Sequence, residues 1–182
     1  MRGVIVTSQF TSRRLQRIGL ERNRIRVVLP GTDPVVQRAN QLSTELPRLL
    51  VVGSLIPRKG HDVLIRALGT LGMQSWHCVC AGSLDRDRRF AEQIMTQAGE
   101  AGIGERVEFV GECNRSTLEQ LYAGASIFVL PSYYEGYGMV LAEALAYGLP
   151  IVSTTGGAIP ETVPAGAGIL VAPGDHLALA NA

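Results

Sequence analysis

The stretch "SIFVLPSYYEGYGMVLAEALAYGLPIVST", residues 126–154, places two short apolar runs around a glycine-rich loop and a helical pattern. The runs at 126–132 and 150–154 are apolar on both faces. Such runs are typical of strands in a parallel sheet, because helices cover both faces of that sheet. The pattern between them predicts a helix over 138–147, which Gly148 is placed to end. We therefore predict a strand–helix–strand unit with parallel strands.

The same alternation of short apolar runs and longer helical patterns continues along the whole chain. We expect strands at 3–6, 48–55, 77–82, 106–111, 126–132, 150–154 and 168–173, and helices at 8–19, 60–71, 86–101, 116–124, 138–147, 158–163 and from 175 onward. This alternation predicts an α/β fold with a doubly wound, mostly parallel sheet. Sheets of this kind bind ligands at the carboxyl ends of their strands.

One segment, Leu29 to Arg48, is dense in turn residues and lacks strand periodicity, which indicates a linker. We expect the linker over 31–47. Residues 1–30 form a strand–helix–strand remnant too small to fold alone, and 48–182 form a complete α/β unit. The first strand begins without a lead-in and the last helix is cut short. We therefore expect a piece of a longer protein, truncated in its C-terminal helix.

Composition limits the possible partners. The formal net charge is +1, which gives no general attraction to nucleic acid or anionic lipid. The basic stretch Ser12 to Arg26 fits a solvated helix face better than a binding patch. No apolar run is long enough for a transmembrane segment, and no signal peptide is present. The three cysteines and three histidines lack metal-site spacing, so we expect reduced thiols, no metal and a cytoplasmic protein.

The segment "VVGSLIPRKGHDVLIRAL", Val51 to Leu68, joins a strand to a helix through a loop with two cations. We expect Arg58 and Lys59 to form an anion site beside the helix start, with Asp62 as its cap. An exposed basic turn is the open alternative, because the segment is not a P-loop. After the next strand, Gly82 would allow a ligand close to the backbone, although most such glycines only form the turn.

Two glutamates frame the helix of the opening stretch. Gly136 and Gly138 would free backbone amides at its start for a second anion site, and Glu135 lies just outside it. Glu135 would repel a bare phosphate, so its ligand should present hydroxyls or developing positive charge. Glu143 lies among apolar residues, where a carboxylate needs hydrogen-bond donors. A solvated loop and an exposed helix face are the alternatives. Cations, amides and carboxylates together suit a sugar nucleotide.

The segment Pro131 to Glu161 resembles the donor-binding core of the family-four retaining glycosyltransferases, also called glycosyl transferases group 1, which have the two-domain GT-B fold. Their signature of two glutamates separated by seven residues matches Glu135 and Glu143. The segments at 52–68, 81–82, 107–112 and 121–132 resemble further family segments in the family's order. Residues 1–30 then resemble the end of the N-terminal acceptor domain, and 48–182 the C-terminal nucleotide-sugar donor-binding domain.

The resemblance implies a role for each matched residue. Lys59 would bind the donor diphosphate, Glu135 would contact the transferred sugar near the reacting carbon, and Glu143 would hold the ribose. We predict Glu135 and Lys59 as catalytic residues. The implied donor contacts are Arg58, Ser54, Gly82, Val110, Gly136, Tyr137, Gly138, Met139, Val140 and Glu143. The family uses a UDP-, GDP- or ADP-linked sugar as donor substrate, with no metal and no cofactor, and retains the anomeric configuration.

The sequence departs from the family in two ways. Ser54 replaces an arginine that usually follows the glycine of the phosphate segment, and we hypothesise that Arg58 compensates. The acceptor domain is missing, so we expect no catalysis by this chain alone and any membrane contact to run through that domain. A sugar-nucleotide epimerase or phosphorylase of the same fold, or a non-catalytic nucleotide-binding module, are the alternatives. His61 is the only candidate acid–base group for an epimerase near the phosphate site, and we interpret it instead as a residue at the start of a helix.

Overall fold

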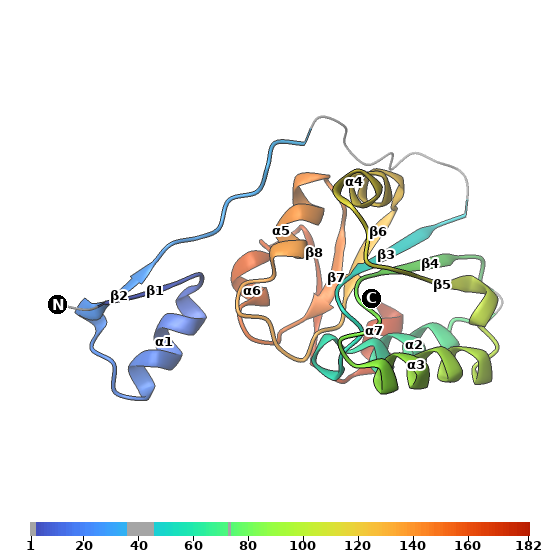
Figure 1. Ribbon diagram of the computed structural model, residues 1–182, viewed down its shortest axis with the longest axis horizontal. Helices are drawn as coiled ribbons and strands as arrows, with labels where there is room; N and C mark the ends of the chain where they lie inside the picture. Colours follow the sequence, from blue (N-terminus) through green and yellow to red (C-terminus); the bar gives the residue numbers. More distant parts are fainter. Residues whose placement is uncertain (1–2, 36–45, 73) are drawn as a thin grey trace.

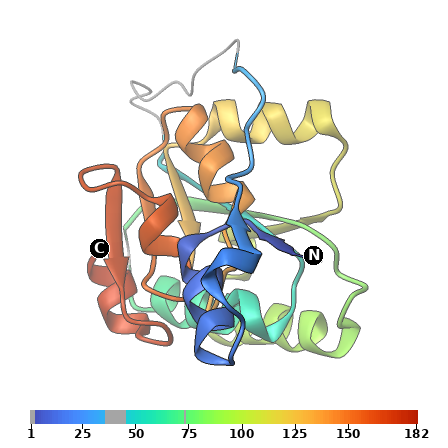
Figure 2. The ribbon, with the colours of Figure 1, turned by 90° about the vertical axis from the view of Figure 1, so that its left-hand side faces the viewer.

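The computed structural model describes residues 3–35, 46–72 and 74–182 (Figure 1). Most of the predicted linker, 36–45, therefore lies outside the described residues. Before it, β1 (Val4–Val6), α1 (Gln9–Arg17), the short 3-10 helix η1 (Arg22–Arg24) and β2 (Ile25–Val27) form a small unit with two parallel strands. Figures 1 and 2 show this N-terminal unit at one end of the larger body, with α1 near α6.

The larger body contains a six-stranded sheet in the order β5-β4-β3-β6-β7-β8, in which every pairing between described strands is parallel. The strands are β3 (Arg48–Val52), β4 (His77–Ala81), β5 (Val107–Gly111), β6 (Ile127–Leu130), β7 (Ile151–Thr154) and β8 (Gly168–Val171). The α-helices are α2 (His61–Gly69), α3 (Arg88–Glu100), α4 (Arg115–Gly124), α5 (Met139–Ala146), α6 (Ile159–Thr162) and α7 (His176–Asn181). Short 3-10 helices are η2 (Pro57–Lys59) and η3 (Gly104–Arg106). The predicted doubly wound fold is confirmed.

The chain reverses direction across this sheet once. From β3 it moves outward through β4 to β5, and it then returns to the other side of β3 with β6. The loops that follow β3 and β6 therefore leave the sheet side by side, at the carboxyl ends of neighbouring strands. In doubly wound sheets this point of reversal is where a ligand binds.

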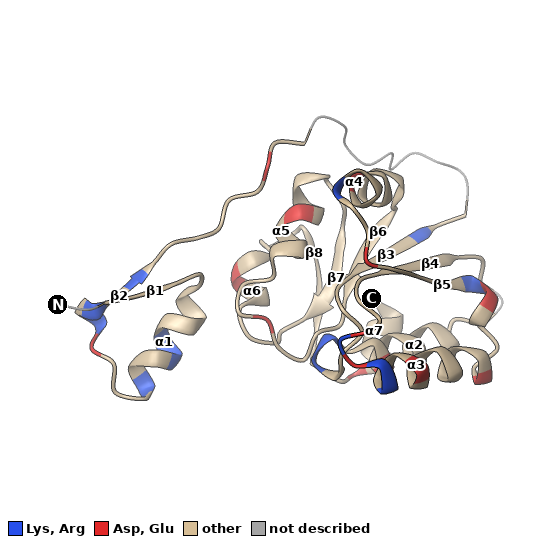
Figure 3. Ribbon diagram, viewed as in Figure 1, with Lys and Arg blue, Asp and Glu red and all other residues tan. Residues whose placement is uncertain are grey.

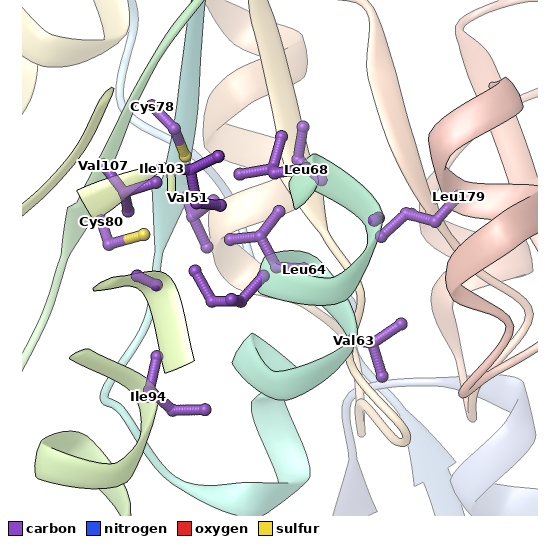
Figure 4. Close-up of a cluster of buried hydrophobic side chains, with 14 of the residues drawn as sticks. Val51, Val63, Leu64, Leu68, Cys78, Cys80, Ile94, Ile103, Val107 and Leu179 are labelled. Atoms are coloured by element: carbon purple, nitrogen blue, oxygen red, sulfur yellow. The ribbon is translucent and has the colours of Figure 1, made fainter. Parts of the chain in front are cut away.

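Both faces of the sheet are buried, as its apolar strands require. Val51 points to a core shared with α2, α3 and α7, which Figure 4 shows with Leu64, Cys80 and Ile94 among its members. Leu50 and Val52, its neighbours in β3, contribute to a second core with α4, α5 and α6. In the described ranges, no helix combines the length and the apolar character that crossing a membrane would need.

Two local predictions were wrong at the end of β3. The strand stops at Val52 instead of residue 55, because the chain turns into a loop at Gly53. Asp62 does not cap α2. The residue before the helix is Gly60, with a left-handed backbone at φ 73°, and Asp62 instead pairs with Arg66 at 3.2 Å.

Gly60 has a steric reason to be glycine. A Cβ there would lie 2.1 Å from the carbonyl oxygen of Pro131, which is far inside van der Waals contact. The loop after β3 and the loop after β6 approach each other closely at this point, and the atom nearest to position 60 is a backbone oxygen. A side chain at position 60 would push them apart.

We predict that Gly60→Ala destabilises the chain more than Gly72→Ala does. Both glycines have positive φ, but a Cβ at Gly72 would meet no atom of the other described residues within 4 Å. Backbone strain alone should reduce the free energy of unfolding by about 1–2 kcal/mol at Gly72. The clash with Pro131 should add about 1–3 kcal/mol at Gly60. Equilibrium urea unfolding measures both losses, and equal losses would contradict the close approach of the two loops.

Candidate functional site

The two residues predicted as catalytic, Lys59 and Glu135, lie where the loop 53–60 meets the loop 131–138. Besides the contact at Gly60, the backbone N–H of Tyr133 donates to the carbonyl oxygen of Arg58 at 2.9 Å. Each loop begins at the carboxyl end of a strand, and each leads directly into a helix. The reversal of the chain between β3 and β6 therefore brings together segments about 75 residues apart.

Lys59 and Glu135 form an ion pair at this junction. The Lys59 Nζ lies 2.7 Å from Glu135 Oε1, and only 13% and 9% of the two side chains are exposed. Buried Ser132 donates its hydroxyl to the same oxygen at 2.7 Å, and an Arg58 nitrogen lies 3.3 Å from it. Gly53 leaves room for the lysine stem, since a Cβ there would lie 3.3 Å from its Cδ and Cε.

The arrangement differs from the predicted one in a specific way. The sequence predicted Lys59 and Glu135 as contacts to different parts of a ligand, whereas the structure places them in direct contact. The contacts among the described residues all reach Oε1 of Glu135, so Oε2 has no protein partner in that part of the chain. Glu135 is also buried, so the solvated-loop alternative is wrong. With two cations beside one carboxylate, the junction carries a local positive charge.

Backbone amides at the start of α5 face no acceptor in the part of the chain that the structure describes. The helix is preceded by Gly138, and no side chain caps it. From Gly136 to Val140, which includes Tyr137 and Met139, no backbone N–H donates to an acceptor within the described residues. Unpaired amides at a helix N-terminus favour an anion. Geometry of this kind fits the predicted second anion site, although its ligand stays a prediction.

Glu143 lies one turn further along α5 and is half-buried, so the alternative of an exposed helix face is wrong. Its Oε2 accepts a hydrogen bond from the hydroxyl of Tyr122 on α4 at 2.8 Å. Glu143, Tyr122 and Met139 line a pocket of about 300 Å³, whose other wall includes Thr32 and Asp33 of the segment that follows β2. The carboxylate therefore faces a space that a small polar group can enter.

The remaining predicted contacts surround the ends of β4 and β5. Gly82 has φ 153°, and a Cβ there would lie 2.2 Å from the carbonyl oxygen of Gly53. The protein's own backbone thus accounts for this glycine, and a donor contact there stays a prediction. Ser54 is half-buried beside Gly82, and Val110 is half-buried near the end of β5, two strands away from β3.

His61 begins α2 and is buried, with 1% of its surface exposed. Burial, together with the charge of Lys59, lowers the pKa of His61 to about 4. Neither ring nitrogen has a hydrogen-bond partner among the described residues. A neutral, buried imidazole of this kind is not an acid–base group presented to a ligand. Among the described residues, no group of three or more His, Cys, Asp or Glu side chains is arranged to hold a metal ion.

The N-terminal unit contacts the body next to this site. Glu161 on α6 accepts the backbone N–H of Phe10 at 3.0 Å and forms an ion pair with Arg13. The Phe10 ring packs edge-on against Tyr134, with 5.7 Å between ring centroids, and Arg14 lies over the same tyrosine ring. Figure 3 shows the acidic residue of α6 on the side of the body that faces basic α1.

Sequence reasoning missed three residues of this region: Ser132, Tyr122 and Glu161. For Ser132, the available signal in the sequence was its position three residues before Glu135, at the start of the predicted loop. Tyr122 lies on a different helix from Glu143, 21 residues earlier. Glu161 meets a segment about 150 residues away. Contacts at such separations leave no periodic signal in one sequence.

Comparisons with known proteins identify the family and the fold that this chain resembles. The family model described as Glycosyl transferases group 1 matches residues 34–182. A D-inositol 3-phosphate glycosyltransferase of Nocardia farcinica is 31% identical over 185 residues, which cover 93% of this chain and 41% of that protein. The chain thus spans about two fifths of the length of this curated relative.

Two solved structures are similar over nearly the whole chain. A sucrose-phosphate synthase from Thermosynechococcus elongatus is 32% identical, with a TM-score of 0.87, over 98% of this chain and 47% of that one. The Anabaena protein HepE in complex with UDP-glucose is 26% identical, with a TM-score of 0.88, over 98% of this chain and 52% of that one. Both the two-stranded unit and the larger body lie within the matched length.

We predict strong energetic coupling between Lys59 and Glu135. Lys59→Met leaves a buried carboxylate without its main partner and should reduce the free energy of unfolding by about 3 kcal/mol. Adding Glu135→Gln removes that unpaired charge, so the double variant should be more stable than the sum of single losses by about 1–3 kcal/mol.

The exposed pair Arg66 and Asp62 is the matched control for this double-mutant cycle, because its two side chains are 51% and 27% exposed. Its coupling should stay below about 1 kcal/mol. Urea unfolding of the four variants and their parents measures both couplings. Equal coupling energies at the two pairs would contradict the prediction that the buried pair Lys59–Glu135 is the more strongly coupled.

Proposed function

Because the chain belongs to the glycosyl transferases group 1 family, we propose that it is the donor-binding part of a retaining glycosyltransferase. The enzyme would transfer a hexose from a nucleoside-diphosphate sugar to an acceptor held by a further domain. The observation that carries this proposal is the Lys59–Glu135 ion pair at the point of reversal in the sheet, beside the unpaired amides of α5.

The diphosphate would occupy the positive side of this junction. A lysine ammonium has three donors, and Glu135 uses one of those of Lys59, so two remain for phosphate oxygens. Arg58 and the amides from Gly136 to Val140 would add donors. Negative charge accumulates on the diphosphate as the glycosidic bond breaks, and fixed donors that are already in place stabilise it.

The transferred sugar would lie against Glu135. Oε1 is held by Lys59 and Ser132, and Oε2 has no partner within the described residues. A sugar hydroxyl supplies the donor that this oxygen needs. Positive charge that develops at the reacting carbon would be stabilised by the same carboxylate. This placement supports the catalytic role proposed for Glu135, and Glu143 would bind the ribose of the nucleotide in the same way.

Relatives suggest which donor to test first. The Anabaena protein is solved in complexes with UDP and with UDP-glucose, so a UDP-linked hexose is our first choice. The chain spans about two fifths of the length of its curated relative, and we propose that the acceptor is held by residues outside it. We accordingly expect no sugar transfer by the 182-residue chain alone. The proposed location is the cytoplasm, since Cys78, Cys80 and Cys113 are free thiols.

The alternative reactions receive less support. An epimerase of this fold would use an acid or base group in the cleft, and His61, the one candidate from the sequence, is buried and neutral. A non-catalytic nucleotide-binding module would have little need for two carboxylates that each keep an oxygen for a ligand. Phosphorylase activity has no observation in its favour.

We predict that the chain binds one nucleoside diphosphate and its sugar conjugate, with UDP first among UDP, GDP and ADP. Lys59→Ala and Glu143→Ala should each weaken binding at least about tenfold, because each removes a charged hydrogen-bonding partner. Arg66→Ala, which removes an exposed cation from α2, is the control and should bind like the parent chain. Isothermal calorimetry measures these affinities, and absence of binding to all three nucleotides would overturn the proposed function.

We also predict that Arg58→Ala weakens nucleotide binding. Arg58 donates to the carbonyl oxygen of Tyr134 at 2.6 Å and lies 3.3 Å from Glu135, so its position is fixed although 45% of the side chain is exposed. It is the cation best placed to compensate for Ser54. The same calorimetric experiment tests this, and an affinity equal to that of the parent chain would refute the compensation.

A further inference from the structure

Tyr122 is held rigidly in the core beside Glu143. Only 2% of its surface is exposed. Its ring stacks on Phe128, at 5.8 Å between centroids, and on Tyr147, at 5.0 Å. Its hydroxyl lies 2.8 Å from Glu143 Oε2. The ring is thus fixed by packing on two sides, and its polar end meets the carboxylate that faces the pocket.

The direction of this hydrogen bond is determined by chemistry. Burial, and secondly the nearby carboxylate of Glu143, raise the pKa of the Tyr122 phenol, so the hydroxyl stays protonated. An ionised carboxylate only accepts hydrogen bonds. The carbonyl oxygen of Val140 is the other acceptor in reach, but at 3.4 Å it is farther and uncharged. The phenol therefore donates to Glu143, and charge strengthens that bond.

We propose that Tyr122 is a positioning residue for nucleotide binding, which fixes Glu143 through Oε2 so that Oε1 accepts the ribose hydroxyls. The inference rests on the proposed function and names a residue that determines recognition of the ribose. A glutamate side chain is flexible, and holding it before the ligand arrives avoids the entropic cost of ordering it on binding. Tyr122 occupies one of about four lone-pair positions of the carboxylate, so enough remain for two hydroxyls.

A purely structural role makes a different prediction. Phenylalanine at position 122 would preserve the stack with Phe128 and Tyr147, since that contact uses only the ring. If the hydroxyl served stability alone, its loss would change the binding of every nucleotide equally. If it orients Glu143, its loss would weaken only ligands whose ribose hydroxyls contact that carboxylate. The two roles therefore differ in how the variant discriminates between ribose and a ribose without hydroxyls.

The experiment compares a nucleoside diphosphate with its 2′,3′-dideoxy counterpart by calorimetry, using the 182-residue chain. UDP, GDP and ADP are the probes, and the tightest binder is carried forward. The parent chain should prefer the ribonucleotide. In Tyr122→Phe that preference should fall about tenfold, as expected for the loss of a hydrogen bond to a charged group. Glu143→Ala should lose the preference altogether.

Ser153→Ala is the control for a general loss of stability. It removes a fully buried hydroxyl that donates to the carbonyl oxygen of Leu130 at 2.6 Å, away from Glu143. Its preference for ribose should equal that of the parent chain, even where urea unfolding shows lower stability. An unchanged preference in Tyr122→Phe, beside a lost preference in Glu143→Ala, would overturn the role of Tyr122 alone. No binding by the parent chain would overturn the proposed function and this inference together.

Discussion

The close backbone approach at Gly60 is the constraint on which the candidate site depends. Gly60 brings the loop after β3 against Pro131, at a distance that no side chain at position 60 would permit. Next to this approach, the Lys59 Nζ lies 2.7 Å from Glu135 across the point of reversal. Burying two charges costs desolvation energy that their attraction does not reliably offset. Stability of the fold alone is therefore a weak reason for the pair, and under the proposed function both charges would contact the donor.

The architecture could be predicted from the sequence because it depends on local patterns. Apolar runs at 126–132 and 150–154 identify strands buried on both faces, and the strands and helices of the six-stranded body follow from the same signal. Contacts within the site could not be predicted in this way. Lys59 and Glu135 are 76 residues apart, and periodicity reports which face a residue occupies, not which distant residue it meets. The prediction that Asp62 caps α2 was wrong for a similar reason. Gly60 occupies the cap position, where the distant residue Pro131 leaves no room for a side chain.

Glu135 and Glu143 have the same hydrogen-bonding arrangement. A buried hydroxyl holds one carboxylate oxygen of each, from Ser132 at Glu135 and from Tyr122 at Glu143. The other oxygen has no partner among the described residues in either case. A carboxylate arranged like this binds donors, not anions, and hydroxyls are neutral donors. Under the proposed function, the eight-residue spacing of the glutamates along the loop and α5 would set the distance between two hydroxyl-bearing parts of one ligand.

The contact between α1 and α6 connects the N-terminal unit to the loop that carries Glu135. Glu161 binds Phe10 and Arg13, and it follows Ala158, whose N–H donates to the carbonyl oxygen of Glu135 at 2.8 Å. An exposed ion pair contributes only about 0–1 kcal/mol, so the contact orients the two units without locking them. Under the proposed function, a weak contact suits a site that must admit a donor and release a nucleotide. Only the residues from Ala158 to Glu161 separate the backbone contact of Glu135 from the contact with the N-terminal unit.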